Sequence, residues 1–316
     1  MTKQDLLDCH ERITPFVHNT SVLTSRLIDK EVNAKVFFKC ENFQRAGAYK
    51  MRGATNAILQ LSDEQKKSGV VTHSSGNFAQ ALSLAAQSVG VTAHIVMPNT
   101  APEVKKVGVR EYLGKIYECE PTVEARQSLA DEIGRKTGAT FIHPSNDNNV
   151  ILGQGTAALE LLEKQPDLEF IFCPVGGGGL IAGSALAVKY LGDDCKVYGA
   201  EPFEADDAYR SLQSGKIESN DTTNTMADGL KTMLGDKNFP IIKELVSGIV
   251  RITEDEIVTA MKLVWERMKI IIEPSSAVTV AAVLKQSKKQ PEVFQNKKIG
   301  IIISGGNVDL SKLPFQ

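Results

Sequence analysis

The chain has 316 residues, of which 42% are hydrophobic and 23% are charged, and its formal net charge is -2. This length is enough to bury a large core, in one large domain or two smaller ones, and the near-neutral charge indicates neither a nucleic-acid nor a membrane-surface partner. No uncharged run approaches the roughly 20 apolar residues of a membrane span, and the charged N-terminal stretch lacks the apolar core of a signal peptide, so we expect a cytoplasmic protein.

Short β-branched runs alternate with longer helical patterns along the chain. Strands are predicted over residues 70–72, 93–97, 115–119, 140–143, 170–175, 196–200 and 298–304. Helices are predicted over residues 79–88, 123–136, 155–164 and 254–268, with capping boxes at Ser62 and Thr253, and the polar residues 211–224 are predicted to form a surface loop. This alternation predicts an α/β fold whose mostly parallel sheets are covered by helices on both faces. Ligands bind such sheets at the carboxyl ends of their strands.

The first candidate for chemistry is Lys50, in a glycine-containing loop at residues 43–54 that leads into a helix. A lone lysine in such a loop is most often solvated and structural. A lysine whose pKa is depressed by burial or by a nearby cation instead forms Schiff bases. Arg52 is placed to supply that cation or to form a salt bridge.

The second candidate is the turn at residues 72–78, where a strand ends and a helix begins. The hydroxyls of Ser74 and Ser75 and the amide of Asn77 join the free N–H groups of the helix start, which suits a carboxylate or phosphate oxygen. An ordinary helix cap is the competing interpretation. His73 is next to the turn, where a structural loop histidine is a more common role than a catalytic base.

Four consecutive glycines, Gly176 to Gly179, follow a strand-like run and open an apolar helix. Their backbone N–H groups are free to surround a phosphate at the helix start. Glu201 lies about where a ribose-binding acid would follow in a dinucleotide site, so that alternative stays open. Near the C-terminus, Ser304 and two glycines end another strand-like run, where the serine is placed to bond a ring nitrogen.

Carboxylates cluster after the strand at residues 196–200, at Glu201, Glu204, Asp206 and Asp207. Oxygen ligands in this density suit a hard divalent cation, and a solvated acidic loop is the competing interpretation. The five cysteines are widely spaced without a C-x-x-C pair, which favours reduced thiols over disulfides or a zinc site.

Taken in this order, the segments resemble fold-type II pyridoxal-phosphate enzymes, and among them the serine racemase and serine/threonine dehydratase family. The resemblance extends from Thr14 to Asn307. It implies two three-layer αβα domains like those of the tryptophan synthase β subunit. Residues 1–67 and 147–316 would form a large cofactor-binding domain, and residues 68–146 a small one. A homodimer is implied in the same way.

The resemblance also implies roles for individual residues. Lys50, as the Schiff-base lysine, and Ser75, as the proton donor on the opposite face, are the implied catalytic residues. The implied contacts with pyridoxal 5'-phosphate are Lys50, Tyr49, Asn77, Gly176, Gly177, Gly178, Gly179, Leu180 and Ser304. A small amino-acid substrate would contact Ser74, Ser75, Asn77 and Arg126. A Mg²⁺ ion, or Ca²⁺ or Mn²⁺, would bind Glu201, the carbonyl of Ala205, and Asp207.

The expected activity is dehydration or racemisation of a small β-hydroxy amino acid, such as L-serine or L-threonine. The chain departs from the family pattern at Ala46, Ala48, Phe78 and Ser145. Because relatives acting on threo-3-hydroxyaspartate lack some of the same hydroxyls, an ammonia-lyase for that substrate is kept as an alternative. A β-replacement enzyme, a dinucleotide-binding oxidoreductase and a non-catalytic sensor are the remaining alternatives.

Overall fold

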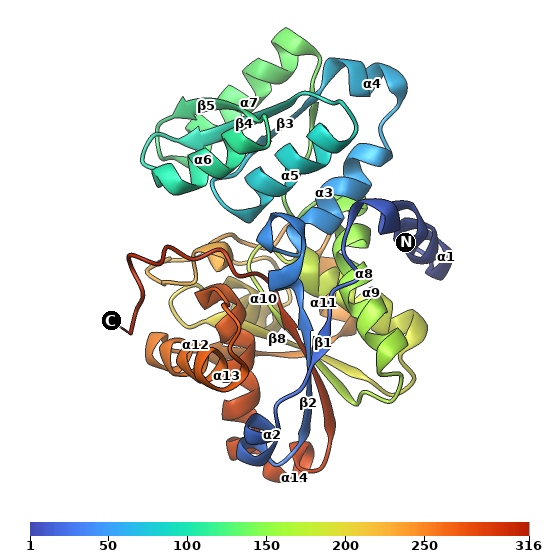
Figure 1. Cartoon of the computed structure of the whole chain (residues 1–316), viewed down its shortest axis with the longest axis vertical. Coiled ribbons are helices and arrows are strands. Elements are labelled where there is room, and N and C mark those ends of the chain that lie inside the picture. The colour runs from blue at the N-terminus through green and yellow to red at the C-terminus, as the bar shows by residue number, and fades with distance from the viewer. Residues whose placement is uncertain (316) are drawn as a thin grey trace.

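The computed structural model describes residues 1–315, apart from the side chain of Val104. It contains two sheets that lie one above the other in Figure 1. The larger sheet has the strand order β1 (Val22–Leu23), β2 (Lys35–Cys40), β10 (Lys298–Ile303), β7 (Phe170–Pro174), β8 (Lys196–Pro202) and β9 (Val246–Ile252). All its neighbouring strands pair in parallel except β1 with β2.

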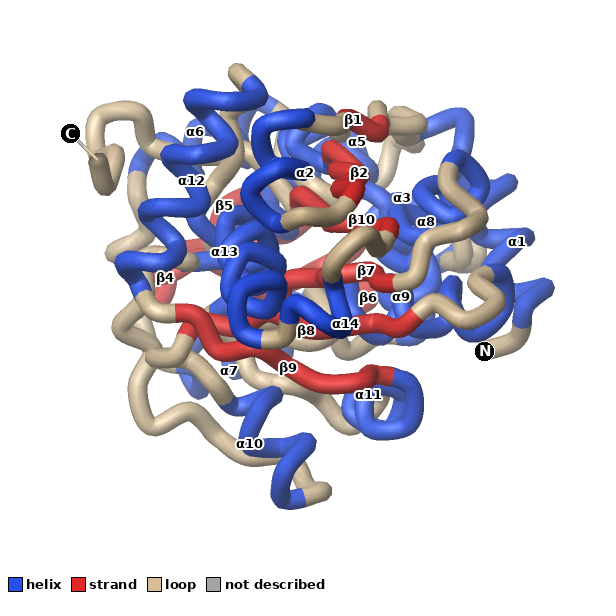
Figure 2. Tube along the Cα trace, turned by 90° about the horizontal axis from the view of Figure 1, so that it is seen from below, coloured by secondary structure: helices blue, strands red, loops and turns tan. Residues whose placement is uncertain are grey.

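Side chains of the larger sheet alternate between two cores, because successive residues of a strand point to opposite faces. Ile301 and Phe172 join the core formed with α2 (Arg26–Val32), α12 (Glu254–Met268) and α13 (Pro274–Lys289). Ile302 and Ile171 join the opposite core, formed with α1 (Lys3–Ile13), α8 (Asn148–Lys164), α9 (Gly179–Leu191) and α11 (Phe239–Leu245). Figure 2 shows the strands between these two groups of helices. Each of these four side chains is fully buried, which stabilises the fold by about 1.5–3 kcal/mol per side chain.

The smaller sheet has the order β5 (Lys115–Cys119), β4 (Ala93–Pro98), β3 (Val70–His73) and β6 (Thr140–Phe141), and all its strands are parallel. Val70 faces a core that includes α5 (Asn77–Ser88), and Val71 faces α7 (Val123–Thr137). Helix α3 (Lys50–Leu59) packs against both α5 and α8, and therefore connects the two sheets. The remaining helices are α4 (Asp63–Ser68), α6 (Glu103–Glu111), α10 (Asp207–Ser214) and α14 (Pro291–Phe294).

The predicted α/β class with mostly parallel sheets and helices on both faces is confirmed. Both capping boxes are present, at Ser62 and Thr253. The predicted helix at 155–164 begins earlier, at Asn148, because Asp147 caps it, and the strand at 140–143 ends at Phe141. The loop predicted over 211–224 is wrong in its first residues, since α10 continues to Ser214. The division into domains at 67/68 and 146/147 stays a prediction.

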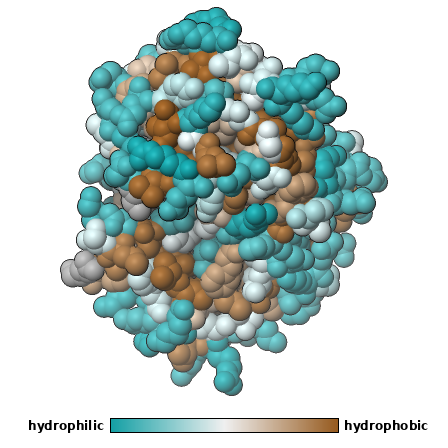
Figure 3. Space-filling model, turned by 45° about the horizontal axis from the view of Figure 1, so that its top comes forward, coloured by the Kyte–Doolittle hydropathy of each residue, from teal (hydrophilic) through white to brown (hydrophobic). Residues whose placement is uncertain are grey.

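Hydrophilic side chains surround smaller hydrophobic areas on the face of the molecule shown in Figure 3. Within residues 1–315, every helix is too short or too polar to cross a lipid bilayer.

Candidate active site

Lys50 lies in an apolar and almost charge-free environment at the first turn of α3. Its Nζ donates a hydrogen bond to the carbonyl oxygen of Pro144 at 2.8 Å, and lies 5.1 and 5.7 Å from the ring centroids of Tyr49 and Phe78. Burial lowers the pKa of Lys50 to about 7, against a smaller opposing effect of the Glu273 carboxylate. A large fraction of this amine is therefore uncharged and nucleophilic near neutral pH.

Arg52 anchors this turn through a buried ion network and faces away from the amine. Its guanidinium binds Glu41 and Glu160 at 2.7 and 2.8 Å, and Glu160 also pairs with buried Lys39. Of the two roles open to Arg52, the structure therefore supports the salt bridge. Because removing one partner from such a network costs about 3–5 kcal/mol, the network fixes α3 firmly against β2 and α8.

The four glycines form a crowded loop between β7 and α9. An added Cβ would lie 2.3 Å from Ser145 Oγ at Gly177, 2.6 Å from Leu234 Cδ2 at Gly178 and 2.4 Å from Gln154 Oε1 at Gly179. Gly178 also has a φ of 80°, which side-chain-bearing residues rarely adopt. The backbone N–H groups of residues 176–181 donate no hydrogen bond to the described part of the chain. The loop is therefore a cradle of free donors at the start of a helix, as a phosphate requires.

The Ser74–Asn77 turn joins β3 to α5, at the carboxyl end of the smaller sheet. Asn77 is bonded to a residue beside the larger sheet: its Nδ2 lies 2.9 and 3.0 Å from the carboxylate oxygens of Glu273. Its Oδ1 accepts a hydrogen bond from Asn307 at 2.9 Å. The turn of the smaller sheet and the loop after β10 are therefore in direct contact.

Ser304 follows β10 and is almost fully buried. Its hydroxyl lies 3.0 Å from that of Ser276, and Ser276 also binds the backbone N–H and carbonyl of Gly305 at 2.8 Å. The hydrogen-bonded neighbour of Ser304 is thus another neutral hydroxyl, and not a carboxylate.

The family of pyridoxal-phosphate dependent enzymes matches residues 13–305. The chain belongs to this family. It is 48% identical over 315 residues to a beta-hydroxyaspartate dehydratase of Paracoccus denitrificans, covering 100% of this chain and 99% of that one. It is 50% identical over 315 residues to a serine racemase of Dictyostelium discoideum, covering 99% and 97%. The structure of maize serine racemase superimposes with a TM-score of 0.96 at 46% identity, covering 98% and 94% of the two chains.

The residues present fit pyridoxal phosphate. A glycine loop with unpaired N–H groups follows β7, and a partly buried amine of lowered pKa begins α3. The dinucleotide alternative fits less well. The Glu201 carboxylate is fully buried and accepts hydrogen bonds from the backbone N–H groups of Ala208 and Tyr209, so it is not directed at a ribose.

Arg126 is not joined to the rest of the predicted substrate site. It lies at the start of α7, where its Nε donates to the carbonyl oxygen of Thr122 at 3.1 Å. In the described part of the chain, no hydrogen bond links it to Ser74, Ser75 or Asn77. Its positive charge instead acts on His73, whose pKa is lowered first by burial and further by Arg126.

Glu201, Ala205 and Asp207 are all buried beside the end of β8. Burial and the charge of Asp207 raise the pKa of Glu201, and burial raises the pKa of Asp207 to about 6. Asp207 accepts hydrogen bonds from Leu234 N and Asn220 Nδ2 at 3.0 and 2.8 Å. Among residues 1–315 no group of three acidic, histidine or cysteine side chains gathers around one point. The potential cation ligands here are therefore the carboxylates of Glu201 and Asp207 and the backbone carbonyl of Ala205.

Two contributors were absent from the sequence-based site. Glu273 directly precedes α13 and its carboxylate accepts from Asn77, and Ser276 supports Ser304 from the first turn of the same helix. The only local signal is a glutamate followed by proline and two serines, which by itself indicates a helix start.

Proposed function

We propose that this enzyme dehydrates or racemises a small β-hydroxy amino acid, with L-serine and L-threonine as the first candidates. Dehydration of these substrates yields a keto acid and ammonia. Support comes from relatives of 44–50% identity whose names are serine racemase or beta-hydroxyaspartate dehydratase. The observation that carries the proposal is the Lys50 amine, which is partly buried, has a pKa of about 7 and bonds to Pro144 beyond the end of the smaller sheet.

The cofactor, when bound, withdraws electrons from the substrate Cα. We assign the removal of the Cα proton to the uncharged amine of Lys50. This is supported by its low pKa, which suits a general base working near neutral pH. The rings of Tyr49 and Phe78 replace part of the water around the amine, which favours its uncharged form.

The phosphate group is assigned to the N–H groups of Gly176 to Leu180, and the ring nitrogen to Ser304. The pairing of Ser304 with Ser276 supports a neutral partner for that nitrogen. A neutral partner leaves the nitrogen largely unprotonated and weakens electron withdrawal, which disfavours transamination relative to elimination or reprotonation.

Substrate binding is assigned to Ser74, Ser75 and Asn77, with Ser75 as the proton donor opposite Lys50. The N–H groups and hydroxyls at the start of α5 suit the substrate carboxylate. We assign Arg126 to the substrate carboxylate on the basis of the family resemblance alone, because its Nε donates to the carbonyl oxygen of Thr122.

The alternative substrate is threo-3-hydroxyaspartate. The Paracoccus relative, a beta-hydroxyaspartate dehydratase at 48% identity, favours it. Ala46 and Ala48 stand where the family commonly has hydroxyl residues, some of which relatives acting on threo-3-hydroxyaspartate also lack. Ala48 is fully buried, and Ala46 stands at a φ of 57°.

We further propose a divalent cation at Glu201, Ala205 and Asp207, with Mg²⁺ first and Ca²⁺ or Mn²⁺ as alternatives. The two buried carboxylates support it, because a bound cation would neutralise them. A cytoplasmic homodimer also remains a proposal. Reduced thiols are consistent with the cytoplasm, since Cys9, Cys40, Cys119, Cys173 and Cys195 are all free.

The experiment that tests the proposed function is a substrate panel on the purified holoenzyme. L-serine, D-serine, L-threonine and threo-3-hydroxyaspartate are each scored for keto acid, ammonia and enantiomer. We expect keto acid from at least one L-β-hydroxy amino acid. A yellow, folded protein that leaves all four unchanged would contradict the proposal and favour a sensor or a β-replacement enzyme.

A further inference from the structure

Lys50 and Gln154 donate hydrogen bonds to the same carbonyl oxygen. The oxygen of Pro144 accepts one bond from Lys50 Nζ at 2.8 Å and another from Gln154 Nε2 at 3.2 Å. A carbonyl oxygen has two lone pairs, so these two donors use its full capacity. The place of the Lys50 amine therefore depends on the direction in which this carbonyl points.

The turn that carries the Pro144 carbonyl is closed by a histidine. His143 Nδ1 accepts hydrogen bonds from the backbone N–H groups of Ser145 and Asn146 at 3.2 and 2.8 Å. Burial lowers the pKa of His143 to about 4, so the ring stays neutral near pH 7 and Nδ1 keeps its lone pair. With the turn closed in this way, the bond from Gln154 fixes the direction of the carbonyl.

Gln154 is confined between the helix that begins with Lys50 and the glycine loop. Its side chain is fully buried. Two glycines make room for it, since an added Cβ would lie 3.0 Å from Gln154 Cγ at Gly53 and 2.4 Å from Gln154 Oε1 at Gly179. The amide also has one favoured orientation, because the opposite one would turn its oxygen towards the oxygen of Pro144. The donor of Gln154 is thus held in one place.

The other end of this amide makes no contribution to stability. Gln154 Oε1 is buried and accepts no hydrogen bond within residues 1–315. A buried acceptor without a donor destabilises the folded state, and an apolar side chain of the same shape would remove that cost together with one long hydrogen bond. Stability therefore gives little reason for a glutamine here, and its remaining contribution is the bond to Pro144.

We propose that Gln154 is a positioning residue, which directs the Pro144 carbonyl so that the Lys50 amine is held ready to react with the cofactor aldehyde. This inference rests on the assignment of Lys50 made above. Because the amine donates to the carbonyl oxygen, its nitrogen lone pair points away from that oxygen. In the capture step the nitrogen forms a C=N bond with the aldehyde carbon, and the two amine hydrogens leave with the aldehyde oxygen as water. The Pro144 oxygen also receives the amine when the substrate releases it.

Capture of two aldehydes by the apoenzyme tests the proposal, measured by stopped-flow absorbance at about pH 8, above the pKa of Lys50 at about 7. Pyridoxal phosphate depends on the glycine loop and on Lys50, whereas pyridoxal has no phosphate and depends on Lys50 alone. Gln154→Met keeps the shape of the side chain and removes the donor. It should slow the capture of both aldehydes by the same factor, roughly tenfold to 100-fold, because the amine is misplaced. Its melting temperature should not fall, since the unpaired acceptor is removed as well.

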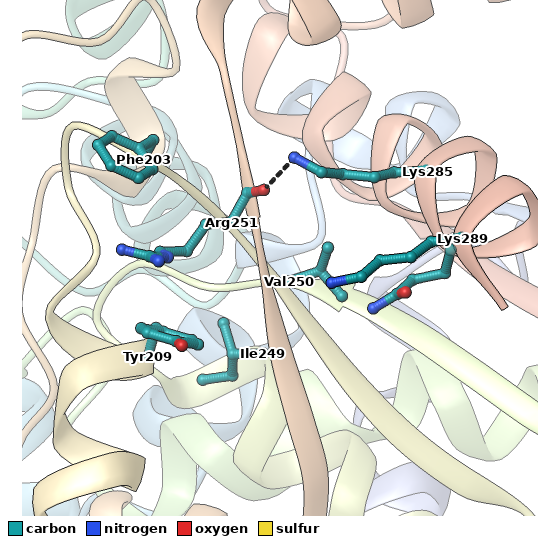
Figure 4. Close-up of a pocket in the computed structure, with 8 residues that line it drawn as sticks. Phe203, Tyr209, Ile249, Val250, Arg251, Lys285 and Lys289 are labelled. Atoms are coloured by element: carbon teal, nitrogen blue, oxygen red, sulfur yellow. Dashed lines mark hydrogen bonds between the residues drawn. The ribbon is translucent and has the colours of Figure 1, made fainter.

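Gln286→Met is the matched control. Gln286 lies near the end of α13 and lines a pocket of about 290 Å³ beside β9, which Figure 4 shows. Its side-chain oxygen is also buried without a donor in the described part of the chain, so the same chemical change is made outside the residues that hold Lys50. The capture rates of this variant should equal those of the wild type.

Wild-type capture rates in Gln154→Met, or an equal loss in Gln286→Met, would overturn the proposal. A loss confined to pyridoxal phosphate would overturn it too, because the role of Gln154 would then lie in the glycine loop. A lowered melting temperature together with lost capture in Gln154→Met would assign the residue to the stability of the fold instead of to positioning. Undiminished capture in Lys50→Ala is a different result, since it would refute the assignment of Lys50 itself.

Discussion

The amide nitrogen of Asn77 lies 2.9 and 3.0 Å from the two carboxylate oxygens of Glu273, although 196 residues separate them in the chain. Asn77 begins α5 beside the smaller sheet, and Glu273 directly precedes α13 beside the larger one. The pair therefore joins the two sheets at the site. Burial raises the pKa of Glu273 to about 7, and its negative charge in turn raises the pKa of Lys50.

This relationship predicts a specific pH dependence for cofactor capture by the apoenzyme. Only the uncharged amine of Lys50 reacts with the cofactor aldehyde, so the rate should rise with pH up to about 7 and then level off. With a solvated lysine, the rate of cofactor capture would continue to rise up to the usual lysine pKa of 10.5. Stopped-flow absorbance measures the profile.

Glu273→Gln should move the midpoint of that profile to lower pH. The substitution removes the negative charge that stabilises the protonated amine, so protonation of Lys50 requires a higher proton concentration. Glu132→Gln is the control, because Glu132 is an exposed residue paired with Lys136 on α7. A midpoint that stays fixed or moves upward in Glu273→Gln would refute the coupling.

Ser75→Ala should separate the two proposed reactions. Loss of a positioned proton donor lowers a rate by about 100-fold or more, so racemisation should fall by that factor while dehydration keeps a substantial part of its rate. Ser74→Ala, one residue away, should affect both reactions alike through substrate binding. Chiral chromatography and a keto-acid assay on the same samples measure the two rates. Equal losses of both activities in Ser75→Ala would argue against a proton donor at this position.

Cation removal should destabilise the protein more strongly at high pH than at low pH. In the cation-free protein the raised pKa values of Glu201 and Asp207 favour protonation in the folded state. The contribution of Asp207 to the free energy of unfolding therefore decreases as the pH rises from about 4 through about 6, and that of Glu201 changes in the same direction. The cation stabilises the folded protein most at a pH where both carboxylates are charged. EDTA should lower the melting temperature by roughly 5 °C at pH 8 and by less at pH 5.5.

Asp207→Asn serves as the control for cation removal, since it takes away one proposed ligand and one buried charge. Its melting temperature should be insensitive to EDTA. A wild-type melting curve that EDTA leaves unchanged at both pH values would contradict the proposed cation site.

The site residues that could be predicted from sequence are those that belong to a local motif of adjacent residues. Gly176 to Gly179 and the turn at Ser74–Asn77 each follow a strand and precede a helix, so each lies at the carboxyl end of its own parallel sheet, where ligands bind. Glu273 gave no such signal, because its partner Asn77 is distant in the chain and only the fold brings them together.

Three strands were missed: the two-residue β1, and β2 and β9, which share a physical reason. β2 contains the buried Lys39, whose charge is neutralised by Glu41 and by Glu160 on α8. β9 is an edge strand that includes Ser247, Gly248 and Arg251, and so lacks a continuous β-branched run. In both cases the stabilising partner is a tertiary contact that local sequence does not contain.

The central claim is that Lys50 holds the cofactor covalently. Borohydride reduction of the holoenzyme, followed by peptide mass mapping, tests it most directly. We predict one pyridoxyl label, on the peptide that contains Lys50, and neither label nor yellow colour in Lys50→Ala. A label on another lysine, or a Lys50→Ala protein that keeps its colour and activity, would contradict the account.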